Sequence, residues 1–145
     1  MVDKALLDTD TISEIGKATD HTVVAAANHY LTFHPCFTIS TVTVMEVVRG
    51  YHLAGRREKL ALFLESLRVQ ELLAFMPSTA ELAGEIDAAL LRSGQRIGRA
   101  DPMIAATAIE HELTLVTGNT EHFARIPALG FSLKLSNWRI AVGEQ

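Results

Sequence analysis

The sequence predicts an α/β fold, with a central, mostly parallel sheet of about four to five strands and helices on both faces. Short apolar runs of strand length alternate along the chain with longer segments in which apolar residues recur at helical spacing. This alternation is typical of parallel sheets whose strands are joined by crossover helices. The chain of 145 residues has no internal repeat and no linker rich in Pro, Gly or Ser, so residues 1–145 are expected to form a single domain.

The first strand and the first helix are predicted at the N-terminus. Residues 4–7 form a short apolar run that stops at Asp8, which favours a strand followed by an acidic turn. Thr11 and Glu14 have the spacing of a helix capping box, so a helix is expected to start near Thr11. Asp8 would then lie at the carboxyl end of the strand, where parallel sheets bind their ligands.

The next elements follow from the spacing of apolar residues. Residues 20–30 carry apolar side chains three and four positions apart, which predicts a helix, and residues 36–40 predict a second strand. Residues 41–51 are expected to form an almost wholly apolar helix, and residues 60–67 continue the helical spacing. Two strands separated by two helices are therefore expected before residue 41.

An extended segment and a capped helix are predicted in the middle of the chain. Residues 72–76 look extended and end at Pro77, which cannot donate a backbone hydrogen bond. Ser78 or Thr79 is expected to cap the helix that follows, and Gly94 is expected to close it.

The C-terminal third is expected to contain a helix and two strands. Asp101 before Pro102 has the pattern of an N-cap followed by proline at the first helical position, which opens a helix of small and apolar residues. Residues 113–117 predict a short strand that ends just before Asn119, and residues 132–135 predict an edge strand.

The composition indicates how the protein could bind nucleic acid and in which cellular compartment it is expected. Thirteen Lys and Arg residues against seventeen Asp and Glu residues give a net charge of −4, so any nucleic acid would have to be held locally rather than by bulk attraction. The single cysteine, Cys36, cannot form an internal disulfide. The N-terminus has no signal-peptide pattern and no segment is apolar enough for a membrane helix, so a cytoplasmic location without membrane contact is expected.

Two acidic residues stand in unusual sequence surroundings. Glu46 lies within an apolar segment, where an isolated carboxylate would be costly, so it is expected either to pair with Arg49 one helical turn on or to face a shared acidic pocket. Asp101 can act as a simple helix cap or can offer its second oxygen to a metal ion. Together with Asp8 and Asn119 near strand ends, these residues are hard oxygen donors without paired His or Cys. They favour Mg²⁺ or Mn²⁺ over zinc.

Four blocks of sequence carry a resemblance to a known family. They are LLDTDTISE (residues 6–14), TVTVMEVVRG (41–50), IGRADPMIAA (97–106) and LVTGNTEHFARIP (115–127). In this order, over nearly the whole chain, they resemble the blocks of PIN-domain ribonucleases, specifically the VapC-type toxins of bacterial toxin–antitoxin pairs. The resemblance implies a single PIN-like domain that hydrolyses single-stranded RNA with Mg²⁺, for which Mn²⁺ can substitute, by attack of a metal-activated water.

The same resemblance implies roles for individual residues. Asp8, Glu46 and Asp101 match the metal-binding acids of the family, and the fourth acidic position of the family is Asn119 here. Thr117 and Glu121 are accessory candidates, and His122 stands where many relatives carry an acid. The catalytic set implied by the resemblance is Asp8, Glu46, Asp101 and Asn119.

The resemblance also implies partners. A homodimer bound by a cognate VapB-like antitoxin is expected, since an arginine of the partner could neutralise the acidic site as a metal ion does. Two basic groups, residues 49–59 and 92–99, flank the acids, and Arg49 and Arg99 are the candidate RNA contacts.

Two other functions remain open at the level of sequence. A haloacid-dehalogenase-type phosphatase would use the Asp-x-Asp-x-Thr pattern that starts at Asp8, but it needs a lysine and aspartates downstream. After Thr117 the chain has only Lys134 and no aspartate. A catalytically inactive binding module with the PIN fold is the second alternative, and Asn119 in place of an acid is the observation that keeps it open.

Overall fold

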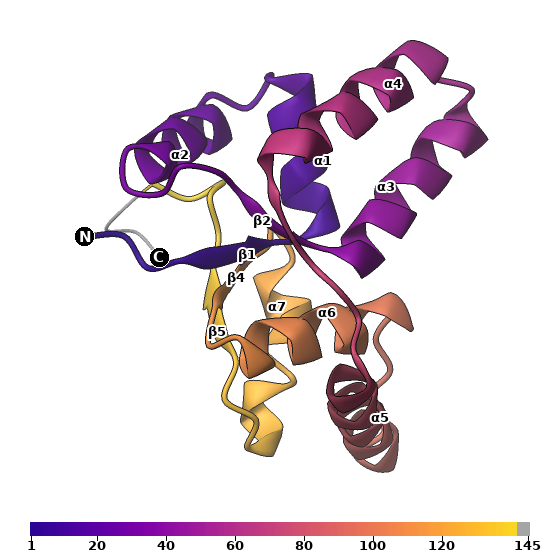
Figure 1. Cartoon of the computed structure of the whole chain (residues 1–145). Helices are drawn as coiled ribbons and strands as arrows, with labels where there is room; N and C mark the ends of the chain where they lie inside the picture. The colour runs from indigo at the N-terminus through magenta and orange to yellow at the C-terminus, as the bar shows by residue number, and fades with distance from the viewer. Residues whose placement is uncertain (142–145) are drawn as a thin grey trace.

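Five parallel strands form one sheet in the computed structural model, which describes residues 1–141 (Figure 1). The strand order is β3-β2-β1-β4-β5, so the first strand in sequence lies at the centre of the sheet. The strands are β1 (Ala5–Leu7), β2 (Thr38–Ser40), β3 (Glu71–Leu73), β4 (Thr114–Val116) and β5 (Lys134–Ser136). All neighbouring pairs are parallel, which confirms the predicted fold class.

Helices connect the strands on both faces of the sheet. They are α1 (Thr9–Lys17), α2 (His21–Leu31), α3 (Thr41–Ala54), α4 (Arg57–Ser66), α5 (Pro77–Arg92), α6 (Ala100–Glu110) and α7 (Thr120–Phe123). Short 3₁₀ turns follow at Leu67–Val69 and Pro127–Leu129. No helix within residues 1–141 is long and apolar enough to cross a membrane.

Two apolar cores lie on opposite faces of the central strand. Successive side chains of a strand point to opposite faces, and Leu6 of β1 accordingly packs with Leu115 and the apolar side chains of α5, α6 and α7. Ala5 and Leu7 pack on the other face with α1 and α2. Figure 1 shows these two sets of helices on opposite sides of the strands. All three residues of β1 are buried, as the continuous apolar run of a two-sided sheet predicts.

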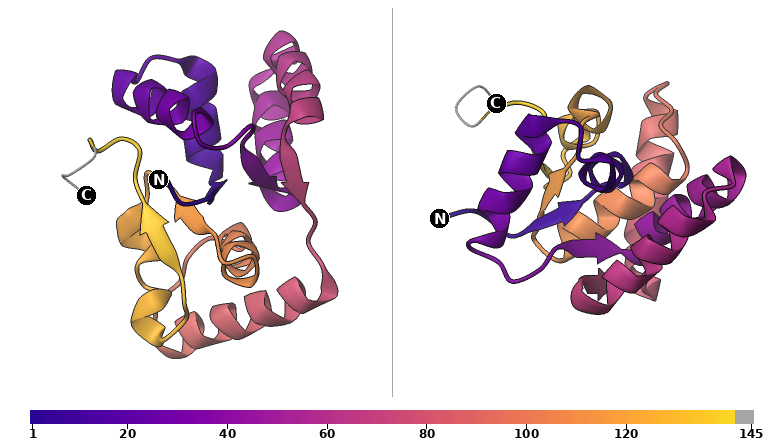
Figure 2. Two further views of the ribbon diagram at one scale, coloured as in Figure 1. Left: turned by 60° about the vertical axis from the view of Figure 1, so that its left-hand side comes forward. Right: turned by 90° about the horizontal axis from the view of Figure 1, so that it is seen from above.

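Helices α3 and α4 form an antiparallel pair that extends away from the sheet (Figure 2). The turn between them is at Gly55, which has a positive φ of 66° and closes α3 with a left-handed cap. Helix α3 therefore runs past the predicted end near residue 51, and α4 starts before the predicted residue 60. Strand β3 starts one residue before the predicted range 72–76 and ends three residues before its end, and β5 is shifted by one or two residues from the predicted range 132–135.

The predicted capping box at the first helix is wrong. Helix α1 begins at Thr9, because Asp8 is its N-cap and accepts a hydrogen bond from the Thr9 amide at 2.8 Å. Thr11 is buried instead and donates to the backbone oxygen of Val116 at 3.3 Å. Tertiary contact with β4 therefore decides the environment of Thr11.

Two further helix starts differ from the prediction. Helix α5 begins at Pro77 with Met76 as N-cap, and Thr79 accepts the Met76 amide at 3.3 Å from inside the first turn. Helix α6 begins at Ala100, so Asp101 lies in its first turn and is not the N-cap. Proline is tolerated at both places because amides in the first turn have no partner within the helix.

Candidate functional site

The candidate site lies at the carboxyl ends of β1 and β4, the two central neighbours of the sheet. Asp8 follows β1 directly, and its amide donates to the Val116 oxygen of β4 at 2.9 Å. Thr117 follows β4, and its amide donates to Ser136 of β5 at 2.9 Å. Asp8 is only 6% exposed and Thr117 is fully buried. The parallel sheet thus brings two polar residues that are 109 positions apart to the same edge.

The Asp8 carboxylate is held on both of its oxygens. Its Oδ1 accepts from the Thr9 amide at 2.8 Å, and its Oδ2 accepts from the Thr117 hydroxyl at 2.8 Å. The same Thr117 oxygen accepts from the Asn119 amide at 3.0 Å, which leaves its single proton for Asp8. Thr117 therefore orients Asp8.

Burial raises the pKa of Asp8 to about 7. The negative charge of Asp10 and, to a smaller extent, that of Asp101 contribute to this rise, while the hydrogen bonds from Thr117 and Thr9 oppose it. The ionised form of Asp8 is therefore disfavoured, first by burial and then by repulsion from these acids. A divalent cation is the simplest group that would relieve this repulsion.

Glu46 reaches this edge from the second turn of α3. Its Oε1 accepts from the Thr9 hydroxyl at 2.6 Å, so Thr9 joins Glu46 to the residue next to Asp8. Within residues 1–141, Glu46 forms no ion pair with Arg49, which is exposed. The predicted pairing with Arg49 is therefore absent from the described residues, and Glu46 contacts the first turn of α1 instead. Thr9 itself was missed, because a threonine in the first turn of a helix has no distinctive sequence signal.

Asp101 is held by a histidine. His122 Nε2 donates to Asp101 Oδ2 at 2.9 Å, and the side chains of both residues are 23% exposed. Helix α6 precedes β4 and runs back along the sheet, so its first turn lies at the carboxyl edge. Gly98 leaves room for the carboxylate, since a Cβ at this position would lie 3.2 Å from Asp101 Oδ2. His122 was noted in the sequence only as a departure from the family pattern.

Asn119 and Glu121 lie at the rim of the site. Both are exposed. The Asn119 backbone amide bonds Thr117, whereas its side chain forms no capping bond to α7. Among the described residues, neither side chain forms a hydrogen bond to Asp8, Glu46 or Asp101.

A second group of charges, missed by the sequence analysis, flanks Asp8. Asp10 Oδ2 accepts from the Gly118 amide at 2.8 Å. Arg139 Nη2 lies 3.8 Å from the same oxygen and 3.5 Å from Glu14 Oε1. Arg139 lies 131 positions beyond Asp8 in the chain, and local spacing carries no signal for such a contact.

Asp8, Glu46 and Asp101 lie at the same edge of the sheet, but their side chains do not form a complete metal coordination shell. Within residues 1–141, no group of three or more His, Cys, Asp or Glu side chains is arranged to hold a metal ion. One oxygen of Glu46 is engaged by Thr9 and one of Asp101 by His122. The donor chemistry nevertheless fits a hard cation, since Asp8, Glu46 and Asp101 supply carboxylate oxygens, and burial together with nearby acids raises the pKa of Asp8.

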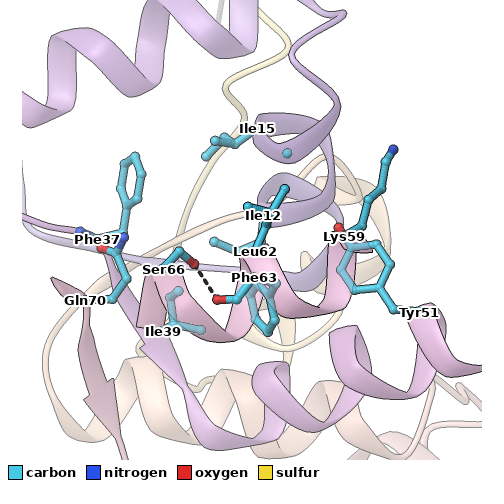
Figure 3. Close-up of a pocket in the computed structure, with 11 residues that line it drawn as sticks. Ile12, Ile15, Phe37, Ile39, Tyr51, Lys59, Leu62, Phe63, Ser66 and Gln70 are labelled. Carbon is cyan, nitrogen blue, oxygen red and sulfur yellow. Dashed lines mark hydrogen bonds between the residues drawn. The ribbon is translucent and has the colours of Figure 1, made fainter. Parts of the chain in front are cut away.

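An apolar pocket of about 310 Å³ opens between α1 and the α3–α4 pair (Figure 3). Helix α1, which starts at the acidic edge, contributes Ile12 and Ile15, and the pair contributes Tyr51, Leu62 and Phe63. Leu62 is 71% exposed, so this apolar surface is accessible from solvent. One helix therefore connects the acidic site with an open apolar pocket.

Comparison with known proteins places these features in a family. The family described as PIN domain matches residues 5–129, a range that includes Asp8, Glu46, Asp101 and Thr117. Ribonuclease VapC2 of Rickettsia felis is 35% identical over 104 residues, which are 69% of this chain and 72% of that protein. The tRNA(fMet)-specific endonuclease VapC of Salmonella typhimurium is 31% identical over 137 residues, which are 93% of this chain and 98% of that protein.

A solved structure agrees with these sequence similarities. The crystal structure of DNA-bound VapBC from Salmonella typhimurium contains a chain that is 28% identical and superposes with a TM-score of 0.79. The superposition covers 94% of the present chain and 99% of the other. The similarity therefore extends over the whole sheet and its helices.

Proposed function

The chain belongs to the PIN domain family, and on this premise we propose that it is a metal-dependent RNA endonuclease of the VapC type, the toxin of a toxin–antitoxin pair. The observation that carries the proposal is the buried Asp8 carboxylate, which Thr117 orients and neighbouring acids crowd at the carboxyl edge of the sheet. A buried group with a strongly raised pKa at such an edge is typical of a functional site.

Mg²⁺ is the cation that the donor set favours, with Mn²⁺ as a substitute, and Asp8, Glu46 and Asp101 are the residues that would hold it. Bound there, the ion would lower the pKa of a water molecule and stabilise the negative charge that develops on a phosphodiester during hydrolysis. Asp8 must be ionised to act as a ligand. Because its pKa is about 7 in the metal-free chain, metal binding near neutral pH releases part of a proton.

The protein's own residues prepare the site for this chemistry. Thr117 and the Thr9 amide fix the Asp8 carboxylate, the Thr9 hydroxyl holds Glu46, and His122 holds Asp101. Such outer contacts reduce the reorganisation that ligand binding requires.

RNA contacts are proposed at two exposed arginines beside the acids. Arg49 lies one helical turn beyond Glu46 on α3, and Arg99 lies two positions before Asp101. On a chain with a net charge of −4, such local cations are the groups able to hold an RNA backbone.

The phosphatase alternative is disfavoured by the position of the lysine. Lys134 is the first residue of β5, and the strands are parallel, so it lies at the amino edge of the sheet, opposite to Asp8. Asp10, the second acid of that motif, is engaged by the Gly118 amide. The RNA cleavage assay described next distinguishes the nuclease from a catalytically inactive binding module.

The test of the activity is cleavage of single-stranded RNA by the purified chain. We expect cleavage with Mg²⁺ or Mn²⁺, none in chelator, and a loss of at least about 10³-fold in Asp8→Asn, because a metal ligand is removed. The control variant Asp3→Asn removes the same charge from an exposed residue and should cleave like the unmodified chain. Equal rates for both variants, or no cleavage by the unmodified chain with either cation, would refute the nuclease function.

The partner proposed for the toxin is a VapB-like antitoxin, and the chain is proposed to form a homodimer. The Salmonella typhimurium structure is a VapBC complex. In the present chain, the apolar pocket between α1 and the α3–α4 pair provides a surface on which an antitoxin helix could pack (Figure 3). Helix α1 connects this pocket to the acidic site.

The test of the partner is co-expression with the product of the adjacent gene. We expect a complex that does not cleave RNA and, for the isolated chain, a dimer in analytical ultracentrifugation. Leu62→Asp should prevent the complex and leave cleavage intact, whereas Leu91→Asp on the exposed side of α5 should not affect the complex. A complex that tolerates Leu62→Asp would place the antitoxin elsewhere.

A further inference from the structure

We propose that Arg139 binds a phosphate group of the RNA substrate beside the scissile bond, from the turn that follows the last strand. The inference rests on the proposed endonuclease function and extends it. It assigns a substrate contact to a residue outside the four sequence blocks and beyond residues 5–129.

The fold places the backbone of Arg139 at the edge where Asp8 lies. Strand β5 is parallel to β4 and pairs Ser136 with Val116, so the turn after β5 lies beside the residues that follow β4. This turn is firmly anchored. The Arg139 amide donates to Asn137 Oδ1 at 2.9 Å, and the buried Trp138 packs against Tyr30 with ring centroids 5.5 Å apart.

The guanidinium group lies directly over Gly118. A Cβ at Gly118 would lie 2.8 Å from Arg139 Cζ and 2.9 Å from its Nε, so only glycine allows this approach. Gly118 is the neighbour of Thr117, whose hydroxyl holds the Asp8 carboxylate. The positive charge is therefore one residue away from the group that orients the central acid.

Arg139 is held loosely by its acidic neighbours. Its Nη2 atom lies 3.8 Å from Asp10 Oδ2 and 3.5 Å from Glu14 Oε1, and its side chain is 41% exposed. Charge-assisted hydrogen bonds are about 2.7–2.9 Å long, so both contacts are ion pairs without a short hydrogen bond. Within residues 1–141 the side chain forms no hydrogen bond, which leaves its N–H groups available for a bidentate contact with phosphate.

The charge of the site explains why such a contact is needed. Asp8, Asp10 and Asp101 repel a phosphodiester, and the protein as a whole is negatively charged. Arg139 is a cation at this edge that can move from carboxylate to phosphate at small cost, since exposed ion pairs are worth about 0–1 kcal/mol.

The experiment measures binding of a single-stranded RNA oligonucleotide to the Asp8→Asn chain, which the proposed function expects to bind RNA without cleaving it. With fluorescence anisotropy at several salt concentrations, we expect Arg139→Gln to raise Kd about tenfold and to reduce the slope of log K against log salt by about 0.7, the value of one phosphate contact on a single strand. Arg139→Lys should retain an intermediate affinity, because it keeps the charge but not the bidentate geometry.

Lys17→Gln is the matched control. Lys17 also pairs with Glu14, at 3.6 Å, but it lies at the far end of α1. If neutralisation of Glu14 were the relevant effect, Lys17→Gln would weaken RNA binding as Arg139→Gln does. We expect it to leave both Kd and the salt slope unchanged.

Cleavage kinetics in the chain with Asp8 intact give a second reading. Arg139→Gln should raise KM about tenfold with a smaller effect on kcat. If Arg139→Gln leaves the Kd, the salt slope and the KM unchanged, the inference is overturned. This holds even if the variant has a different melting temperature. An unmodified chain that neither cleaves nor binds RNA would overturn the endonuclease function as well, so the two failures are distinguishable.

Discussion

At the residue scale, Asp8 combines two roles that favour the same side chain. One oxygen caps α1 by accepting the Thr9 amide, and the other is oriented by Thr117. Burial among other acids makes the charged form costly, as the raised pKa shows. The ionised Asp8 carboxylate therefore lowers the free energy of unfolding of the metal-free chain.

This cost predicts a pH dependence of stability in the metal-free chain. Because the pKa of Asp8 is about 7 in the folded chain and lower in the unfolded chain, the unfolded state ionises first as pH rises. The contribution of Asp8 to the free energy of unfolding therefore falls between about pH 4 and pH 7. The fall is on the order of a few kcal/mol, because each unit of difference between the two pKa values corresponds to about 1.36 kcal/mol.

Asp8→Asn should remove this contribution while keeping the cap, since asparagine also caps helices. Urea unfolding in chelator at several pH values should show the variant gaining stability relative to the unmodified chain as pH rises toward 7. A difference between the two chains that does not change with pH would contradict the raised pKa.

His122 provides the second prediction at this scale. Its hydrogen bond holds Asp101 Oδ2, and loss of an outer partner of a metal ligand costs about 10–100-fold in affinity or activity. His122→Phe should weaken Mn²⁺ binding by this amount in calorimetry. His122→Gln, which can still donate, should weaken it less, and equal affinities for all three chains would show that Asp101 needs no such support.

At the element scale, the site depends on how closely the loop after β4 approaches the first turn of α1. Gly118 donates its amide to Asp10, and a Cβ at this position would lie 2.6 Å from Asp10 Oδ2. The absence of a side chain at Gly118 therefore allows the two segments to meet. Neither segment specifies this approach by its own propensity.

Gly118→Ala should consequently push the side chains of Asp10 and Arg139 away from residue 118. We expect a loss of about 1–3 kcal/mol in the free energy of unfolding, the usual cost of overpacking, together with weaker RNA cleavage. Gly84→Ala is the control, because a Cβ at this position in α5 meets no atom within 4 Å. There, alanine should stabilise the helix by about 0.5–1 kcal/mol. Unchanged stability and activity in Gly118→Ala would show that the loop adapts without strain.

At the scale of the whole molecule, the central strand separates two cores and ends at the acidic site. Leu6 faces one core and Leu7 the other, and Asp8 is the next residue. A ligand that binds Asp8, Glu46 and Asp101 would therefore connect β1, α3 and α6, elements from both faces of the sheet.

Mg²⁺ should accordingly stabilise the whole fold. Binding to the folded state alone raises the free energy of unfolding by about 2.7 kcal/mol at a free ion concentration of 100 Kd. Thermal unfolding with and without chelator should show a rise in Tm with Mg²⁺ for the unmodified chain and little change for Asp8→Asn. An equal shift in both chains would locate the ion away from Asp8.

The sequence by itself determined the order of strands and helices and the acids that lie near strand ends. The alternation of apolar runs and the glycine that closes a helix at Gly94 are local signals, and the structure contains both. Glu46 was recognisable because a charge within an apolar helix requires a partner.

Only the tertiary structure decided which partner each of these residues has. Glu46 is bonded by Thr9 and not by Arg49, Asp101 by His122, and Arg139 reaches the acids of α1. These contacts join residues that are 21 or more positions apart. Local propensity does not encode such pairs, because they depend on the parallel register of the strands and on the closeness that packing of both cores imposes. The starts of α1 and α6 also differ from the local capping signals, because Asp8 caps α1 and Asp101 lies inside the first turn of α6, where it contacts His122.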